Sequence, residues 1–81
     1  MSIRILFFAS LAEVTGLHET EVEVSAGSDV ASIFAGFVRD FPGLEAHRSS
    51  LLSAVNSQFA RPETPVRDGD EVAFFPPVSG G

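Results

Sequence analysis

Residues 28–43, SDVASIFAGFVRDFPG, decide the fold, because they predict the one long helix of this 81-residue chain. Apolar side chains recur there every three or four residues and would form one broad buried face. They are Val30, Ile33, Phe34, Phe37, Val38 and Phe41. Ser28 is the expected N-cap, with Asp29 in the first turn near the positive end of the helix. Pro42-Gly43 should end the helix.

Two extended segments precede this helix. Residues 3–8 are β-branched and aromatic, which is typical of a strand. Residues 19–24 place glutamate at every second position, the period of a half-buried strand with one wet face. Residues 10–14 predict a short helical turn ended by Gly16. Because this connection is short, the two strands are expected to pair antiparallel.

The segments after the helix complete a sheet. Residues 44–49 predict a second short helix, and residues 51–56 a strand that turns into a short extended piece around residues 59–60. Asp68-Gly69-Asp70 is a turn signal that leads into a last strand, residues 71–75.

The order strand, strand, helix, strand, strand indicates an α+β roll, a mixed sheet with the main helix across one face. The β-grasp, or ubiquitin-like, arrangement fits this order and length, although periodicity alone does not select it over other α+β rolls. We expect one domain over residues 1–75 and a flexible extended tail over residues 76–81. An 81-residue chain cannot divide its core further and remain stable.

Composition excludes several classes of protein. Hydrophobic residues are 44% of the chain, which argues against disorder throughout, and the absence of cysteine excludes disulfides, thiolate zinc sites and a cysteine nucleophile. Eleven acidic residues against five arginines and no lysine make nucleic acid and anionic membranes poor partners. No apolar run approaches the ~20 residues of a membrane span, and no signal peptide is apparent, so the expected location is cytoplasmic.

No catalytic constellation or metal site is apparent among the side chains. His18 and His47 are the only histidines, and without cysteine they make a weak metal set. The alternating glutamates are better explained as the wet face of a strand, and Asp68-Gly69-Asp70 lacks the ligand spacing of a calcium loop. Whether the chain is an enzyme in its own right therefore stays open, and we expect it to bind no cofactor.

Two strands place aromatic side chains on the face that should be wet. Arg4 marks the outer face of residues 3–8, yet Phe8 shares that face, and Phe75 stands on the outer face of the last strand. An exposed patch of Phe8 and Phe75, with Phe59 beside it, would suggest a protein interface. The alternative is that strand twist or a loop buries these rings.

The end of the sequence is the second unusual feature. Pro76-Pro77 stiffens the backbone, and Val78-Ser79 leads to Gly80-Gly81 and its α-carboxylate. Six residues at ~3.3 Å each reach roughly 20 Å, enough to enter a neighbouring active site. Glycines without side chains would pass a narrow channel, although a frayed tail would also fit this composition.

A presented carboxylate has a definite chemistry. ATP would adenylate it to a mixed anhydride, and attack by a sulfur donor would then give a thiocarboxylate whose sulfur can be passed on. Such a carrier needs no catalytic side chain of its own, which matches their absence.

The segments Ile5–Ala9, Leu52–Asn56 and above all Asp68–Gly81, DGDEVAFFPPVSGG, resemble the molybdopterin synthase small subunit family. The similarity spans nearly the whole chain, while residues 25–50 match only in pattern. The ending Phe74–Gly81 is its most specific part.

This resemblance implies a β-grasp sulfur carrier. A ubiquitin-activating-type enzyme would use ATP to adenylate Gly81, which then becomes a thiocarboxylate and supplies sulfur to cyclic pyranopterin monophosphate in the large synthase subunit, within a heterotetramer. Gly80 would give passage, and the segment Pro76, Pro77, Val78, Ser79 would line the insertion channel. The aromatic residues Phe8, Phe59 and Phe75 would contact both partners.

Three alternatives remain. A sulfur carrier for thiazole synthesis shares the Gly-Gly end but usually lacks the Phe-Phe-Pro-Pro stretch. A ubiquitin-like modifier would form conjugates with lysines of other proteins. A β-grasp interaction module would use no tail chemistry at all.

Overall fold

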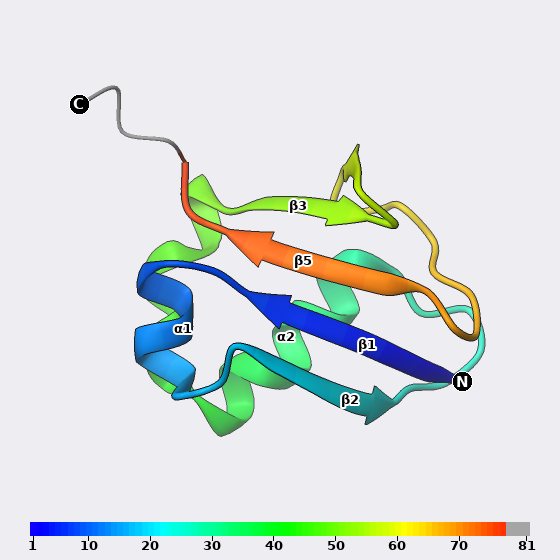
Figure 1. Cartoon of the computed structure of the whole chain (residues 1–81), viewed down its shortest axis with the longest axis horizontal. Coiled ribbons are helices and arrows are strands. Elements are labelled where there is room, and N and C mark those ends of the chain that lie inside the picture. The colour runs from blue at the N-terminus through cyan, green and yellow to red at the C-terminus, as the bar shows by residue number, and fades with distance from the viewer. Residues whose placement is uncertain (78–81) are drawn as a thin grey trace.

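The structure, a computed structural model, describes residues 1–77 and shows a mixed sheet with one long helix across one face (Figure 1). The strands are β1 (Ser2–Phe7), β2 (Glu19–Glu23), β3 (Leu52–Val55), β4 (Gln58–Ala60) and β5 (Glu71–Phe75). The helices are α1 (Ser10–Thr15), α2 (Val30–Asp40) and a 3-10 helix, η1 (Pro42–Ser50).

The strand order is β2-β1-β5-β3-β4, with β1 and β5 parallel and the other neighbours antiparallel. This topology confirms the predicted β-grasp α+β roll, and the antiparallel β1–β2 pair is confirmed with it. The division at residue 75 into domain and tail stays a prediction.

The core lies between α2 and the inner face of the sheet. Most of the apolar positions predicted for the helix are buried against alternate residues of the central strands; they are Val30, Ile33, Phe34 and Phe37 against Ile3, Ile5, Phe7, Val72 and Phe74. Val38 and Phe41, predicted for the same face, are half-buried at the margin of this core. Phe7 meets Phe37 edge-on at 5.1 Å between ring centroids, and Phe74 lies 5.2 Å from Phe34. Such aromatic pairs add to the stability from burial alone.

The start of α2 differs from the prediction by one residue. Asp29, not Ser28, is the N-cap: its carboxylate accepts from the Ser32 backbone N–H at 2.8 Å. In return the Ser32 hydroxyl accepts from the Asp29 N–H at 3.0 Å. This reciprocal capping box outcompetes a single serine cap, and the Ser28 hydroxyl instead donates to the Ser25 carbonyl at 2.7 Å.

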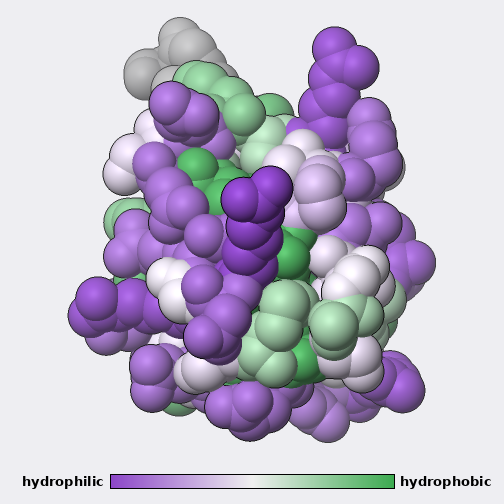
Figure 2. Space-filling model, turned by 90° about the vertical axis from the view of Figure 1, so that its right-hand side faces the viewer, coloured by the Kyte–Doolittle hydropathy of each residue, from purple (hydrophilic) through white to green (hydrophobic). Residues whose placement is uncertain are grey.

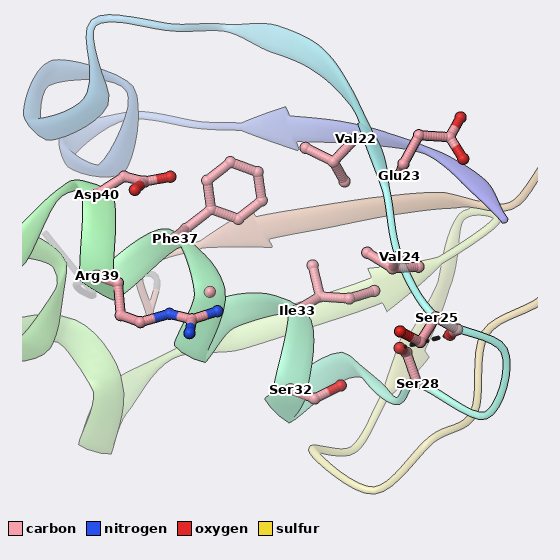
Figure 3. A pocket seen from close by; sticks show the side chains of 11 residues that line it. Val22, Glu23, Val24, Ser25, Ser28, Ser32, Ile33, Phe37, Arg39 and Asp40 are labelled. Carbon is pink, nitrogen blue, oxygen red and sulfur yellow. Dashed lines mark hydrogen bonds between the residues drawn. The ribbon is translucent and has the colours of Figure 1, made fainter.

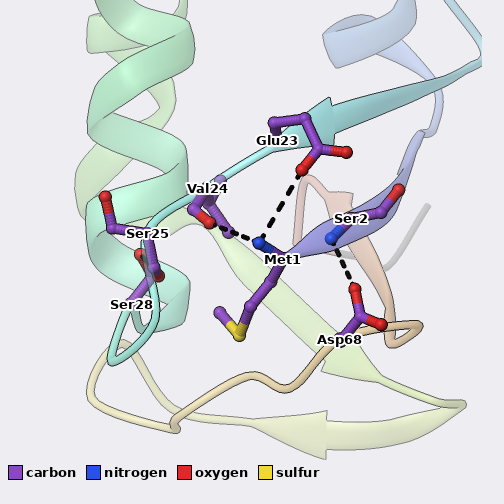
Figure 4. A network of polar contacts seen from close by, with 7 residues as sticks. All are labelled: Met1, Ser2, Glu23, Val24, Ser25, Ser28 and Asp68. Carbon is purple, nitrogen blue, oxygen red and sulfur yellow. Dashed lines mark hydrogen bonds and ion pairs between the residues drawn. The ribbon is translucent and has the colours of Figure 1, made fainter.

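The chain start is tied to its neighbours on both sides (Figure 4). The Met1 amine donates to the Val24 carbonyl at 2.8 Å and lies 3.7 Å from the Glu23 carboxylate, while the Ser2 N–H donates to the Asp68 carboxylate at 2.7 Å. These contacts fix β1 between β2 and the turn before β5. Figure 2 shows this end of the molecule, which is mostly hydrophilic.

The turn from β1 into α1 is strained at Ala9, which has φ of 51° and ψ of −129°. The Leu11 N–H donates to the Phe8 carbonyl at 3.1 Å, which closes a β-turn with Ala9 at its first central position. These angles are those of a type II′ turn, where glycine is favoured because a Cβ is disfavoured at positive φ.

We therefore expect Ala9→Gly to raise the free energy of unfolding by about 1 kcal/mol, since strain relief should exceed the added freedom of the unfolded chain. Urea denaturation measures the change. Ala35→Gly is the matched control: Ala35 is exposed within α2, and glycine there should lower stability by about 1 kcal/mol. Equal losses in both variants would show that Ala9 carries no strain.

Candidate functional site

The aromatic patch, defined as Phe8, Phe59 and Phe75, is assembled on the sheet face opposite α2. β1 and β5 run parallel and end side by side (Figure 1), and the Phe8 N–H continues their ladder by donating to the Phe74 carbonyl at 3.1 Å. The Phe8 and Phe75 ring centroids are 6.4 Å apart, and those of Phe59 and Phe75 are 5.9 Å apart. Phe8 and Phe75, which alternation assigned to the outer face, thus form one cluster with Phe59, as predicted.

The patch is open to solvent. Phe59 is 81% exposed and Phe8 48% exposed, while Phe75 between them is half-buried. Neither strand twist nor a loop of residues 1–77 covers the patch, so the alternative explanation of buried rings is wrong for Phe8 and Phe59. Contiguous aromatic surface of this kind is typical of protein interfaces.

Leu52 adjoins the patch and was not predicted to belong to it. It pairs with Phe75 in the β3–β5 register and is 36% exposed. The next residue, Ser53, is buried opposite Phe74, so a serine faces the core while a leucine faces solvent. Polarity alone would assign the two faces the other way round.

The turn between β3 and β4 carries the signal that locates Leu52. Asn56 and Ser57 both have positive φ, 49° and 70°, as in a two-residue type I′ hairpin turn. Such a turn pairs Ala54 with Phe59, which places every second residue of β3, Leu52 included, on the face of Phe59.

The other half of the same face is acidic. Glu19, Glu21 and Glu23 project from β2, and two positive charges lie beside them: Arg4 pairs with Glu19, and the Met1 amine lies 3.7 Å from the Glu23 carboxylate. The Arg4 Nε donates to the Glu19 carboxylate at 2.9 Å, and this hydrogen bond and charge raise the pKa of the guanidinium. Apolar surface on β1, β5 and β3 therefore borders negative charge on β2.

A polar network holds the β3–β4 turn against the start of β5. The Asn56 side-chain amide donates to the Asp70 carboxylate at 2.9 Å, and its oxygen accepts from the Glu71 N–H at 3.0 Å. The Asn56 hydrogen bond, with the Arg67 backbone N–H, lowers the pKa of Asp70. The Asp70 carboxylate holds this turn in place through its hydrogen bonds, which makes it a poor candidate for a catalytic group.

The tail leaves the sheet beside the aromatic patch. β5 ends at Phe75, after which Pro76 is half-buried and Pro77 exposed. The predicted site residues Val78, Ser79, Gly80 and Gly81 lie outside the described residues, so their roles stay predictions.

Residues 1–77 hold no group of three or more His, Asp or Glu side chains placed to bind a metal ion. Among the helices of that range, none has the length and apolar content to cross a membrane.

Known proteins resemble this chain over its whole length. The model of the ThiS family matches residues 5–81. The molybdopterin synthase sulfur carrier subunit of Chlamydomonas reinhardtii is 35% identical, with 100% of both chains covered. The crystal structure of SAMP1 from Haloferax volcanii, a protein also described as small archaeal modifier protein 1, has a TM-score of 0.85 at 32% identity over 100% of both chains. One chain in the solved complex of subunit 1 and 2 of the molybdopterin-converting factor from Helicobacter pylori has the same fold, with a TM-score of 0.67 at 21% identity, and the match covers 100% of that chain and 100% of this one.

Proposed function

The chain belongs to the ThiS family, and we propose that it is the sulfur carrier subunit of a molybdopterin synthase. The observation that carries this proposal is the exposed aromatic patch at the point where β5 continues toward Pro76-Pro77 and Gly80-Gly81. A carrier needs a surface that partners recognise and an end group that they can reach. Relatives that match this chain over nearly the whole length of both proteins are named sulfur carrier subunits, which supports the same function.

The proposed chemistry takes place on the carboxyl group of Gly81. An adenylating enzyme transfers AMP from ATP to a carboxylate oxygen and releases pyrophosphate. A sulfur donor then attacks the carbonyl carbon, AMP leaves, and a thiocarboxylate remains. In the large synthase subunit this sulfur forms a bond to a carbon of cyclic pyranopterin monophosphate. Water then attacks the Gly81 carbonyl carbon, the carbonyl carbon–sulfur bond breaks, and the tail returns to a carboxylate. The catalytic side chains all belong to the partners.

The aromatic patch would dock the carrier on both partners in turn. Its centre, Phe75, is followed directly by Pro76, so docking fixes the origin of the tail. Two prolines then limit the directions that the tail can take, which lowers the entropy cost of placing Gly81 in a distant active site.

Mass spectrometry tests the proposal directly. Incubation with ATP, the adenylating enzyme and a sulfur source should raise the mass of the chain by one oxygen-to-sulfur exchange, located at Gly81. Addition of the large subunit and the pterin substrate should reverse the gain. An unchanged mass, or a gain elsewhere in the chain, would contradict the proposed function.

The likeness to SAMP1 favours a second candidate, a modifier attached to other proteins. The same activated Gly81 would then form an amide with a lysine amine of a target. Because this chain has no lysine, it could not be an acceptor for further copies through lysine. Conjugates in the mass spectra of cell extracts, in place of a free thiocarboxylate, would favour this candidate.

A further inference from the structure

A groove of about 600 Å³ runs between β2 and α2, on the side of the sheet away from the aromatic patch (Figure 3). The lining of the groove is mixed. Its apolar residues are Val22 and Val24 from the strand side and Ile33 and Phe37 from the helix, and its polar residues include Ser32, Arg39 and Asp40 of α2. Glu23, between the two valines, points away from the helix. The proposed sulfur transfer uses no part of this groove.

The strand that borders the groove has an open edge. In residues 1–77, β2 pairs with β1 and with no strand on its other side. The bonds to β1 come from alternate residues, since the Phe7 N–H donates to the His18 carbonyl and the Val24 N–H to the Met1 carbonyl, both at 2.9 Å. The backbone N–H and C=O groups of the glutamates at positions 19, 21 and 23 therefore point outward, free to pair with another strand.

A glycine keeps the groove open. Gly36 lines it from the interior of α2, where glycine costs helix stability relative to alanine. A Cβ built at Gly36 would meet only the Arg39 Nη2, at 3.8 Å, which is an ordinary contact. Packing within residues 1–77 thus does not require glycine here, and a larger side chain at this position would take up space in the groove.

We propose that this edge and groove bind an extended segment of a partner protein as an added strand, and that the segment alternates apolar and basic residues. Side chains of a strand beside β2 would point by turns to its two faces. On one face the apolar side chains would enter the groove beside Val22 and Val24, and on the other face the basic ones would lie beside the glutamates of β2. The charge of that row selects lysine or arginine.

The same row argues against a second copy of this chain as the occupant. Pairing of β2 with another β2 would bring two rows of glutamates side by side, and like charges across a strand pair are destabilising. A basic segment from another protein removes that cost.

An acetylated, amidated Lys-Val-Lys-Val-Lys-Val peptide is a suitable probe, followed by NMR of the ¹⁵N-labelled full chain. Binding should slow hydrogen exchange at the Glu21 and Glu23 amides, which point outward, and leave the Thr20 and Val22 amides, already bonded to β1, unchanged. A Glu-Val peptide of the same length should bind at least about tenfold more weakly. The Lys-Val peptide N-methylated at alternate residues, unable to donate to β2, should not bind.

Variants of single residues test whether the peptide binds in the groove, without changing the fold. Gly36→Leu should fill the groove and weaken peptide binding about tenfold or more without loss of stability, since leucine is a better helix former. Glu21→Lys should weaken it comparably, and Phe59→Ala, on the aromatic patch, should leave it unchanged. Gly36→Leu should still acquire sulfur at Gly81, so this inference and the sulfur-carrier proposal can fail separately.

Three results would overturn the inference: equal binding of the acidic peptide, no protection of the Glu21 and Glu23 amides, or dimers of the chain in sedimentation that involve β2.

Discussion

Replacing Phe74 by alanine should lower the free energy of unfolding by about 3–5 kcal/mol, whereas the same change at its neighbour Phe75 should chiefly weaken binding to the large synthase subunit. Phe74 is fully buried, with its ring 5.9 Å from Phe7 and 5.2 Å from Phe34 between centroids. A chain of this size has a total stability of roughly 4–12 kcal/mol. Phe74→Ala therefore threatens the folded state itself.

Phe75 lies one residue further along β5 and faces the opposite side of the sheet. It is half-buried between Phe8 and Phe59, the central position from which aromatic residues contribute most to an interface. We expect Phe75→Ala to weaken binding of the large subunit by ~1–3 kcal/mol in titration calorimetry. Its stability loss in urea should be well below that of Phe74→Ala.

Phe74→Ala and Phe75→Ala are matched controls for each other, because the two substitutions remove the same atoms from adjacent positions of one strand. Unaltered binding by Phe75→Ala would exclude the patch as the docking surface. A stability loss equal to that of Phe74→Ala would assign Phe75 to the core and remove the evidence for an interface.

The sequence was most informative where periodicity is strong. Period two separated the buried Ile5 and Phe7 of β1 from Arg4 and Phe8 on the outer face, and the three-and-four spacing located the buried side of α2. These patterns can be recognised in the sequence because one face of each element is buried and the other is exposed to solvent. The outward positions of Phe8 and Phe75 were therefore predictable from the sequence, whereas the place of Phe59 beside them follows from the β3–β4 pairing.

Features that depend on competition or on distant pairing were not predictable in the same way. Ser28 and Asp29 are both good N-caps, and only the reciprocal bonds with Ser32 decide between them. The outward position of Leu52 depends on the β3–β5 register, which local composition does not encode. The groove beside β2 requires the strand order, since an edge strand is defined only by the neighbours it lacks.

Deleting Gly81 tests how far the tail must extend, because the truncated chain still ends in a carboxylate, now on Gly80. The chemical group is unchanged, yet it ends about 3.3–3.6 Å short of its former position. Misplacement of a reacting group by 1 Å can cost ~100-fold in rate. We therefore expect sulfur loading of the truncated chain to fall by at least about 100-fold in the mass-spectrometric assay.

Binding should survive this truncation. The hydrophobic core of the described residues extends no further than Phe74, and the aromatic patch no further than Phe75, so urea stability and large-subunit affinity should stay close to those of the intact chain. Ser79→Ala is the matched control, since it keeps the length of the tail and should load sulfur normally. Undiminished loading after loss of Gly81 would mean that the adenylating enzyme does not measure distance from the docked domain, and that the stiff Pro76-Pro77 segment has no part in positioning the reactive end.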